Sequence, residues 1–214
     1  MRYLIVCGGK TDKEFGLNEI KTDGIDAIIA ADSGMDFLYE NGVTPDIIVG
    51  DFDSTTTNAL EYFERKGQTE IRRLNPIKDD TDTEYAIRLA ISEGARSIVL
   101  LGATGSRIDH VLGNISLLGI GLESGTDISI IDTNNRIRMA DKPVTIEKSA
   151  QYGRFVSLIA LTDDNEVSLK GFKYPVTDYS FDRFTSLGIS NEIVDDHALI
   201  DIHRGKFIII ESKD

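Results

Sequence analysis

Six short segments rich in Ile, Val, Leu and Ala recur through the first 131 residues, and they constrain the fold more than any other feature of this sequence. They span residues 3–7, 27–30, 47–49, 71–74, 97–101 and 128–131. Because most are continuous rather than alternating, they are typical of parallel strands covered on both faces. Segments with helical spacing lie between them, at residues 83–93 and 108–122. The alternation predicts an α/β protein with a doubly wound parallel sheet.

The pattern changes after residue 125. The segments R-F-V-S-L-I-A-L, N-E-V-S-L-K-G-F and A-L-I-D-I-H-R-G-K-F-I-I-I-E are typical of strands, and few helical periods remain. The last segment predicts a hairpin around H-R-G-K. We therefore predict two domains, an α/β domain over residues 1–125 and a smaller all-β sandwich domain over residues 126–214.

The charge balance excludes some classes of function. Lys and Arg number 23 against 36 Asp and Glu, a net charge of −13, which argues against a general nucleic-acid or anionic-membrane binder. No apolar stretch reaches the length of about 18 residues that a membrane span needs. The apolar run at the start of the sequence is too short to be the core of a signal peptide. The sequence has one cysteine, Cys7, which we expect to be a buried thiol. We expect a cytoplasmic protein.

Polar residues collect directly after the predicted strands. The second strand leads into D-S-G (32–34), the third into G-D-F-D-S (50–54), the fourth into N-P-I-K-D-D-T-D (75–82) and the fifth into G-A-T-G-S-R-I-D-H (102–110). Helix capping explains one small polar residue in such a loop, but not several acids. Open α/β sheets bind ligands at the carboxyl ends of their strands, so these loops predict a ligand site.

Four acids are candidates for a metal site in these loops: Asp51, Asp53, Asp82 and Asp109. If they converge, their carboxylate oxygens suit Mg²⁺ rather than zinc. The three histidines are scattered, and no His or Cys cluster has zinc spacing.

The same loops offer hydroxyl, backbone and guanidinium donors for a phosphate group. Neither common phosphate-binding motif is present. G-G-K-T (8–11) lacks the upstream glycine of a P-loop, and no G-x-G-x-x-G occurs. If the ligand is a nucleotide, a different kind of loop must hold it.

Five motifs in this order resemble the thiamine pyrophosphokinase family: A-A-D-S-G (30–34), G-D-F-D-S (50–54), K-D-D-T-D (78–82), G-A-T-G-S-R-I-D-H (102–110) and G-I-S-N-E (188–192). The resemblance spans nearly the whole chain. It implies a Rossmann-like catalytic domain, a β-sandwich domain, a homodimer, and Mg²⁺-dependent transfer of pyrophosphate from ATP to the hydroxyl of thiamine, which leaves AMP.

The resemblance also implies roles for single residues. Asp51, Asp53 and Asp82 would carry magnesium and catalysis, with Asp109 beside them. The residues expected to face ATP are Asp32, Ser33, Lys78, Thr81, Thr104, Gly105, Ser106 and Arg107. Ser190 and Asn191 would contact the pyrimidine of thiamine across the dimer interface. Animal members stack a tryptophan on thiamine, and this chain has none, so that part of the pocket must differ.

Chemistry alone leaves three points open. Either Asp82 or Asp53 could accept the proton of the thiamine hydroxyl. D-F-D-S-T (51–55) also matches the D-x-D-x-T motif of haloacid-dehalogenase-type phosphatases, in which the first acid, here Asp51, is the nucleophile. A non-catalytic nucleotide or metal sensor is the third alternative.

Overall fold

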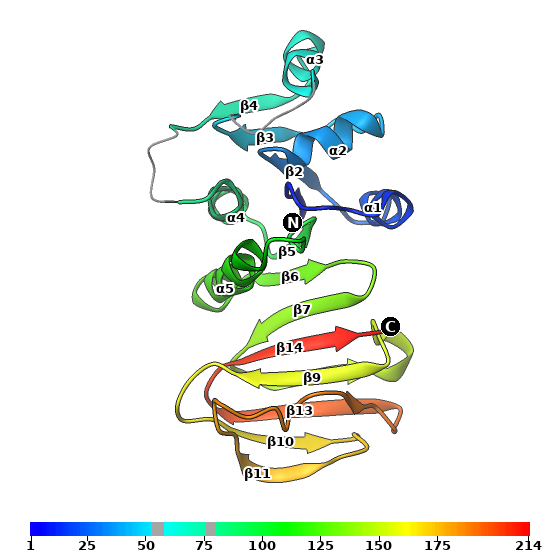
Figure 1. Cartoon of the computed structure of the whole chain (residues 1–214), viewed down its shortest axis with the longest axis vertical. Coiled ribbons are helices and arrows are strands. Elements are labelled where there is room, and N and C mark those ends of the chain that lie inside the picture. Colours follow the sequence, from blue (N-terminus) through cyan, green and yellow to red (C-terminus); the bar gives the residue numbers. More distant parts are fainter. Residues whose placement is uncertain (53–57, 76–79) are drawn as a thin grey trace. The chain divides into compact units, whose positions relative to one another are not determined.

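The computed structural model describes residues 1–52, 58–75 and 80–214. Two of the predicted site residues, Asp53 and Lys78, lie outside the described residues. The chain divides into two compact units, Met1–Thr133 and Asn134–Asp214 (Figure 1). Our assignment of functional domains to residues 1–125 and 126–214 stays a prediction.

The first unit contains a sheet of parallel strands, as predicted. Its strands are β1 (Arg2–Val6), β2 (Ala27–Ala31), β3 (Ile47–Gly50), β4 (Glu70–Arg73), β5 (Ser97–Leu101) and β6 (Asp127–Ile131). They lie in the order β6-β5-β1-β2-β3-β4, and every neighbouring pair among them is parallel. The central strands are almost fully buried, which explains their continuous apolar sequence.

Helices connect these strands. They are α1 (Lys13–Ile20), α2 (Gly34–Glu40), α3 (Ala59–Lys66), α4 (Asp82–Ser92) and α5 (Ile108–Ser124). In Figure 1, α1 and α2 lie on one face of the parallel sheet, and α4 and α5 lie on the other. This is the doubly wound arrangement predicted from the sequence.

The strand order reverses between β1 and β5. From β1 the chain builds outward through β2, β3 and β4, and it then returns to the other side of β1 to add β5 and β6. At such a switch point the two neighbouring connections leave toward opposite faces, which opens a crevice at the carboxyl ends of the strands.

The second unit is a β-sandwich, as predicted. One set of strands, β12-β9-β14-β7, comprises Asn191–Glu192, Phe155–Ala160, Phe207–Ser212 and Asn135–Ala140. The facing set, β11-β10-β13-β8, comprises Val176–Ser180, Glu166–Lys170, His197–Arg204 and Val144–Glu147, and all neighbours within each set are antiparallel. A short 3₁₀ helix, Lys148–Ala150, follows β8. Apolar side chains from both sets form one buried cluster.

The predicted hairpin around H-R-G-K is wrong. Strand β13 pairs with β10 and β8, whereas β14 pairs with β9 and β7, so the two strands belong to opposite sheets. The chain crosses between the sheets at Gly205, whose φ is 91°. A Cβ there would lie 2.3 Å from the side-chain oxygen of Asn165, so this tight crossing requires glycine.

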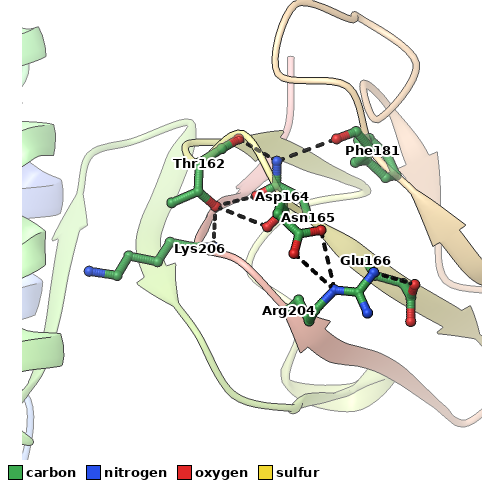
Figure 2. A network of polar contacts seen from close by, with 7 residues as sticks. All are labelled: Thr162, Asp164, Asn165, Glu166, Phe181, Arg204 and Lys206. Carbon is green, nitrogen blue, oxygen red and sulfur yellow. Dashed lines mark hydrogen bonds and ion pairs between the residues drawn. The ribbon is translucent and has the colours of Figure 1, made fainter.

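A polar network around Asn165 holds this crossing in place (Figure 2). Asn165 is almost fully buried, and its amide donates to the carbonyl oxygens of Thr162 and Phe181. The Thr162 hydroxyl donates to Asn165 at 2.5 Å and accepts from the backbone N–H of Lys206 at 3.1 Å. The network therefore ties the β9–β10 turn both to the segment that enters β14 and to the end of β11.

A buried ion-pair cluster lies between the neighbouring strands β7 and β14. Glu211 is completely buried, and its carboxylate accepts from Arg136 at 2.7 Å and from Arg138 at 2.8 Å. The backbone N–H of Tyr152 donates to the same carboxylate at 3.0 Å. Because a buried carboxylate is costly unless it is paired, these donors are what allow Glu211 to stay inside the sandwich.

Within the described residues, no helix is both long enough and apolar enough to cross a membrane.

Candidate functional site

Three acids meet at the carboxyl edge of the parallel sheet. Asp32 follows β2, Asp51 follows β3, and Asp82 is the first residue of α4. One carboxylate oxygen from each lies within 4.8 Å of the others, and all three residues are partly buried. Oxygen-only donors in this arrangement suit a hard divalent cation such as Mg²⁺, which keeps several water ligands and binds few carboxylates directly.

The backbone beside these acids adopts unusual conformations. Asp32 has a φ of 48° and Phe52, next to Asp51, has a φ of 64°. Left-handed conformations cost about 1–2 kcal/mol for residues other than glycine, and Asp tolerates them better than Phe. The Phe52 ring lies under the guanidinium of Arg73, 5.4 Å from the ring centroid. Strain of this kind commonly occurs at functional sites, where it fixes the direction of a side chain.

Close packing fixes the strand ends around the acids. A Cβ on Gly34, the first residue of α2, would lie 2.0 Å from the carbonyl oxygen of Val6, and a Cβ on Gly8 would lie 2.2 Å from the hydroxyl oxygen of Ser33. Gly34 has no room for a side chain, because the atoms that it would meet are backbone atoms, whereas a side chain at Gly8 would require the Ser33 hydroxyl to move. The start of α2 therefore sits directly against the end of β1, which places Asp32 and Ser33 next to the G-G segment.

The N-terminus of α4 positions Asp82. Thr81 is the N-cap, and its hydroxyl accepts from the backbone N–H of Glu84 at 3.2 Å. Asp82 lies in the first turn of α4, where the helix dipole favours a negatively charged side chain. Behind it, Thr83 bonds to the fully buried thiol of Cys7, and burial raises the pKa of Cys7 to about 11. The prediction of a buried, unbridged Cys7 is confirmed.

The loop from Gly102 to Arg107 packs against the end of β1. Gly102 has a φ of 68°, and its carbonyl oxygen accepts from the N–H of Gly9 at 2.8 Å. Thr104 donates its hydroxyl to Asp132 at 2.9 Å, and Asn114 donates to the carbonyl oxygen of Ala103 at 2.7 Å. These bonds give the loop a fixed shape at the same sheet edge as the three acids.

Asp109 is not brought into the group of three acids in the described part of the chain. It forms an ion pair with Arg107 at 2.6 Å, and both side chains are about two-thirds exposed. The hydrogen bond from Arg107 is the main reason that the pKa of Asp109 is lowered. The expected convergence therefore holds for Asp51 and Asp82, with Asp32 as the third partner.

The G-I-S-N-E segment lies in the second unit. Ser190 has a φ of 60°, and its N–H donates to the Ser157 hydroxyl at 2.9 Å. Asn191 is buried, and its amide bonds to both backbone groups of Tyr174: the side-chain oxygen accepts from the Tyr174 N–H at 3.1 Å, and the side-chain nitrogen donates to the Tyr174 carbonyl at 2.9 Å. Asn191 thus holds Tyr174, a residue that is 62% exposed.

Two features of the structure escaped the sequence analysis, one in each unit. Asp32 was expected to face the nucleotide, yet its carboxylate groups with the metal-site candidates; its place directly after a strand, like that of Asp51, was the available signal. Tyr174 has no motif of its own. It is singled out only by its exposure and by its bonds to Asn191.

Comparisons with known proteins agree with the resemblance. The family model described as "Thiamin pyrophosphokinase, catalytic domain" matches residues 21–130, and the model described as "Thiamin pyrophosphokinase, vitamin B1 binding domain" matches residues 143–207. The thiamine pyrophosphokinase of Bacillus subtilis (strain 168) is 34% identical over 188 residues, which is 87% of each chain.

Solved structures show the same similarity over the full length. The crystal structure of the Bacillus subtilis thiamine pyrophosphokinase has a TM-score of 0.89 and 31% identity and covers 100% of both chains. That of Geobacillus thermodenitrificans has a TM-score of 0.87 and 29% identity, and covers 100% of this chain and 98% of that one. The chain belongs to the thiamine pyrophosphokinase family.

Proposed function

We propose that this protein is a thiamine diphosphokinase, which transfers pyrophosphate from ATP to the hydroxyl of thiamine to give thiamine diphosphate and AMP. The observation that carries the proposal is the grouping of Asp32, Asp51 and Asp82 at the ligand-binding edge of the sheet, in a chain of this family. We further propose that it is cytoplasmic, as expected from its sequence, and that it acts as a homodimer, which rests on the sequence resemblance alone.

We assign Mg²⁺ to the three acids, with Asp53 as a further proposed ligand. The cation would neutralise charge on the phosphate chain of ATP, because phosphoryl transfer depends mainly on charge stabilisation and alignment. The acids supply fixed negative charge on one side of that chain. Asp32 thereby takes a metal-binding role in addition to the nucleotide contact expected for it and Ser33.

The remaining phosphate contacts follow from the loops at the same edge. We propose that Lys78, Thr81, Thr104, Gly105, Ser106 and Arg107 face the nucleotide. Arg107 is exposed, so it can reach an added phosphate chain, and its pair with Asp109 would then exchange for a pair with phosphate. Asp109 stays a proposed catalytic residue, because its ion pair with Arg107 keeps it beside a side chain that we assign to the phosphates. The base that accepts the thiamine proton is Asp82 or Asp53.

We assign the thiamine contacts to the second unit. Ser190 is exposed and stays a proposed contact to the pyrimidine, reached across the dimer interface. Asn191 also stays a proposed contact to thiamine, and its buried amide positions Tyr174. The exposed Tyr174 ring offers an aromatic surface to a cationic heterocycle, in a chain that has no tryptophan.

The Tyr174→Ala variant is expected to raise the KM for thiamine about tenfold, since a cation–aromatic contact contributes roughly 1–2 kcal/mol. Tyr174→Phe keeps the ring and should stay within about twofold of the wild type, and the KM for ATP should not change in either variant. Steady-state kinetics with each substrate varied in turn measures both constants. An unchanged thiamine KM in Tyr174→Ala would remove this residue from the site.

The AMP assay tests the proposed function directly. The protein is incubated with ATP and Mg²⁺, with and without thiamine, and the products are separated by chromatography. We expect AMP and thiamine diphosphate in equal amounts, and only when thiamine is present. Inorganic phosphate would instead support the phosphatase alternative, and binding without product would support the sensor. The family comparisons favour neither alternative, because both matching models are thiamine pyrophosphokinase models.

A further inference from the structure

The residue that follows Asp51 is held in a conformation that its type disfavours. Phe52 has a φ of 64°, in the left-handed region where a bulky residue is an outlier and where glycine, Asn and Asp are far more common. Such a conformation persists only where the surrounding structure determines it. The contacts of the Phe52 ring therefore have to supply what keeps the chain in this turn.

The first of these contacts is with Gly50, two residues back in the chain. A Cβ at Gly50 would lie 3.1 Å from the Phe52 ring and 3.1 Å from the Cα of Asp32, both closer than side chains normally approach. The N–H of Asp32 also donates to the carbonyl oxygen of Val49 at 2.8 Å. The Phe52 ring, Gly50 and the backbone of Asp32 are thus packed against one another, which links the positions of two of the three acids.

The second contact of the ring is with Arg73. Arg73 is the last residue of β4 and lies beside Gly50 in the parallel register of β3 and β4 (Figure 1). Its guanidinium carbon lies 5.4 Å from the centroid of the Phe52 ring, and the same guanidinium forms an ion pair with Glu64 of α3. The N–H of Leu74 donates to the carbonyl oxygen of Gly50 at 2.9 Å, so the backbone beneath this stack is also fixed.

The charge of Arg73 cannot be its contribution to a cation site. Arg73 has the same sign of charge as the cation that we assign to the acids, so its charge opposes binding of that cation. Its contact with Phe52 acts in the opposite direction if it holds the turn that carries Asp51. The loss of Arg73 therefore has effects of opposite sign on cation affinity under the two roles.

We propose that Arg73 and Phe52 are positioning residues of the cation site. Arg73, held by Glu64, stacks on the Phe52 ring, and the ring holds the turn from Gly50 to Phe52 so that Asp51 faces the other two acids. The inference rests on the proposed function, because that function assigns the cation to the acids. It adds two side chains that supply no ligand oxygen, and it gives a reason for a phenylalanine at a left-handed position.

Mn²⁺ affinity, measured by electron paramagnetic resonance in the presence of AMP, tests the role of Arg73. We expect Arg73→Leu to bind Mn²⁺ about three- to tenfold more weakly, the range set by the loss of one cation–aromatic contact, although loss of the charge alone would strengthen binding. The matched control is Lys66→Leu. Lys66 lies 5.6 Å from the centroid of the Tyr62 ring and donates to Thr44, before the amino end of β3, at 2.6 Å. This control removes the same charge and should bind Mn²⁺ at least as tightly as the wild type.

Variants of Phe52 test the ring itself. Phe52→Leu should weaken Mn²⁺ binding to a similar extent, whereas Phe52→Tyr keeps the ring and should stay within about twofold of the wild type. The double variant, Arg73→Leu with Phe52→Leu, should bind no more weakly than Phe52→Leu alone, because both changes remove the same contact. Circular dichroism verifies that each variant is folded, which we expect for Arg73→Leu because the Arg73 side chain is 59% exposed.

Wild-type or tighter Mn²⁺ affinity in a folded Arg73→Leu variant would overturn the inference, as would equal weakening in Lys66→Leu. If Arg73→Leu does not fold, the Phe52 variants decide, and equal affinities of Phe52→Leu and Phe52→Tyr would overturn it. If Arg73→Leu weakens Mn²⁺ binding but the wild type forms no AMP from ATP and thiamine, only the proposed function fails. If AMP is formed and Arg73→Leu keeps its Mn²⁺ affinity, only this inference fails.

Discussion

The Asp51→Asn variant is expected to lower kcat for pyrophosphate transfer by roughly 10²- to 10³-fold, the usual effect of removing one preorganised electrostatic group from a site. Asp51 follows β3 and shares a site with Asp32 and Asp82, so the amide removes one charge from the group that we assign to Mg²⁺. The fold should be retained, because Asp51 is only partly buried and lies outside the apolar core.

Asp46→Asn is the matched control for this experiment. Asp46 precedes β3 at its amino end and accepts from the N–H of Ile28 at 2.7 Å, a bond that an amide oxygen can also accept. The Asp46→Asn variant should therefore have a kcat close to that of the wild type. The measurement is kcat from AMP release at saturating ATP and thiamine, with circular dichroism to verify folding. A folded Asp51→Asn variant with wild-type kcat would rule out the metal-site assignment.

The Glu211→Ala variant is expected to lower the free energy of unfolding by about 3–5 kcal/mol, the usual cost of breaking a buried ion pair by removing one partner. Without the carboxylate, Arg136 and Arg138 lose their shared counter-charge, and the N–H of Tyr152 loses its acceptor. Both arginines are more than two-thirds buried, so solvent replaces these bonds only in part.

Glu166→Ala provides the comparison at a more exposed ion pair. Glu166 pairs with Arg204 at 2.9 Å, but the arginine side chain is more than half exposed. Exposed pairs contribute about 0–1 kcal/mol, so this variant should be much closer to the wild type. Urea unfolding followed by circular dichroism measures the free energy of unfolding of both variants. Equal small losses in the two variants would show that the cluster at Glu211 contributes little to the stability of the sandwich.

The parallel sheet was predictable because burial on both faces leaves a direct trace in sequence. Strands such as β2 and β5 are nearly continuous apolar runs, and each predicted strand lies within one or two residues of the observed one. The error at Gly205 has a physical reason. A two-residue connection suits both a hairpin and a crossing between sheets, and the outcome depends on distant partners, here the Asn165 network and the strands β9 and β10.

The site was predictable to the level of its loops but not of its side-chain directions. The acids after successive strands indicated a common edge, and Asp51 and Asp82 do lie together there. The left-handed backbone at Asp32 and the pairing of Asp109 with Arg107 are set by local geometry that residue types do not encode. The contact of Asn191 with thiamine stays a prediction, and its hydrogen bonds to Tyr174 depend on how the chain returns across the sandwich, which residue types do not encode.

The central claim is that Asp32, Asp51 and Asp82 together hold one divalent cation at the nucleotide site. Mn²⁺ binding, measured by electron paramagnetic resonance in the presence of AMP, tests this most directly, with the wild-type protein beside Asp32→Asn, Asp51→Asn, Asp82→Asn and the control Asp46→Asn. We expect the three site variants each to weaken binding by at least about tenfold, or 1.4 kcal/mol, with the control unchanged. Wild-type affinity in all three site variants would contradict the account.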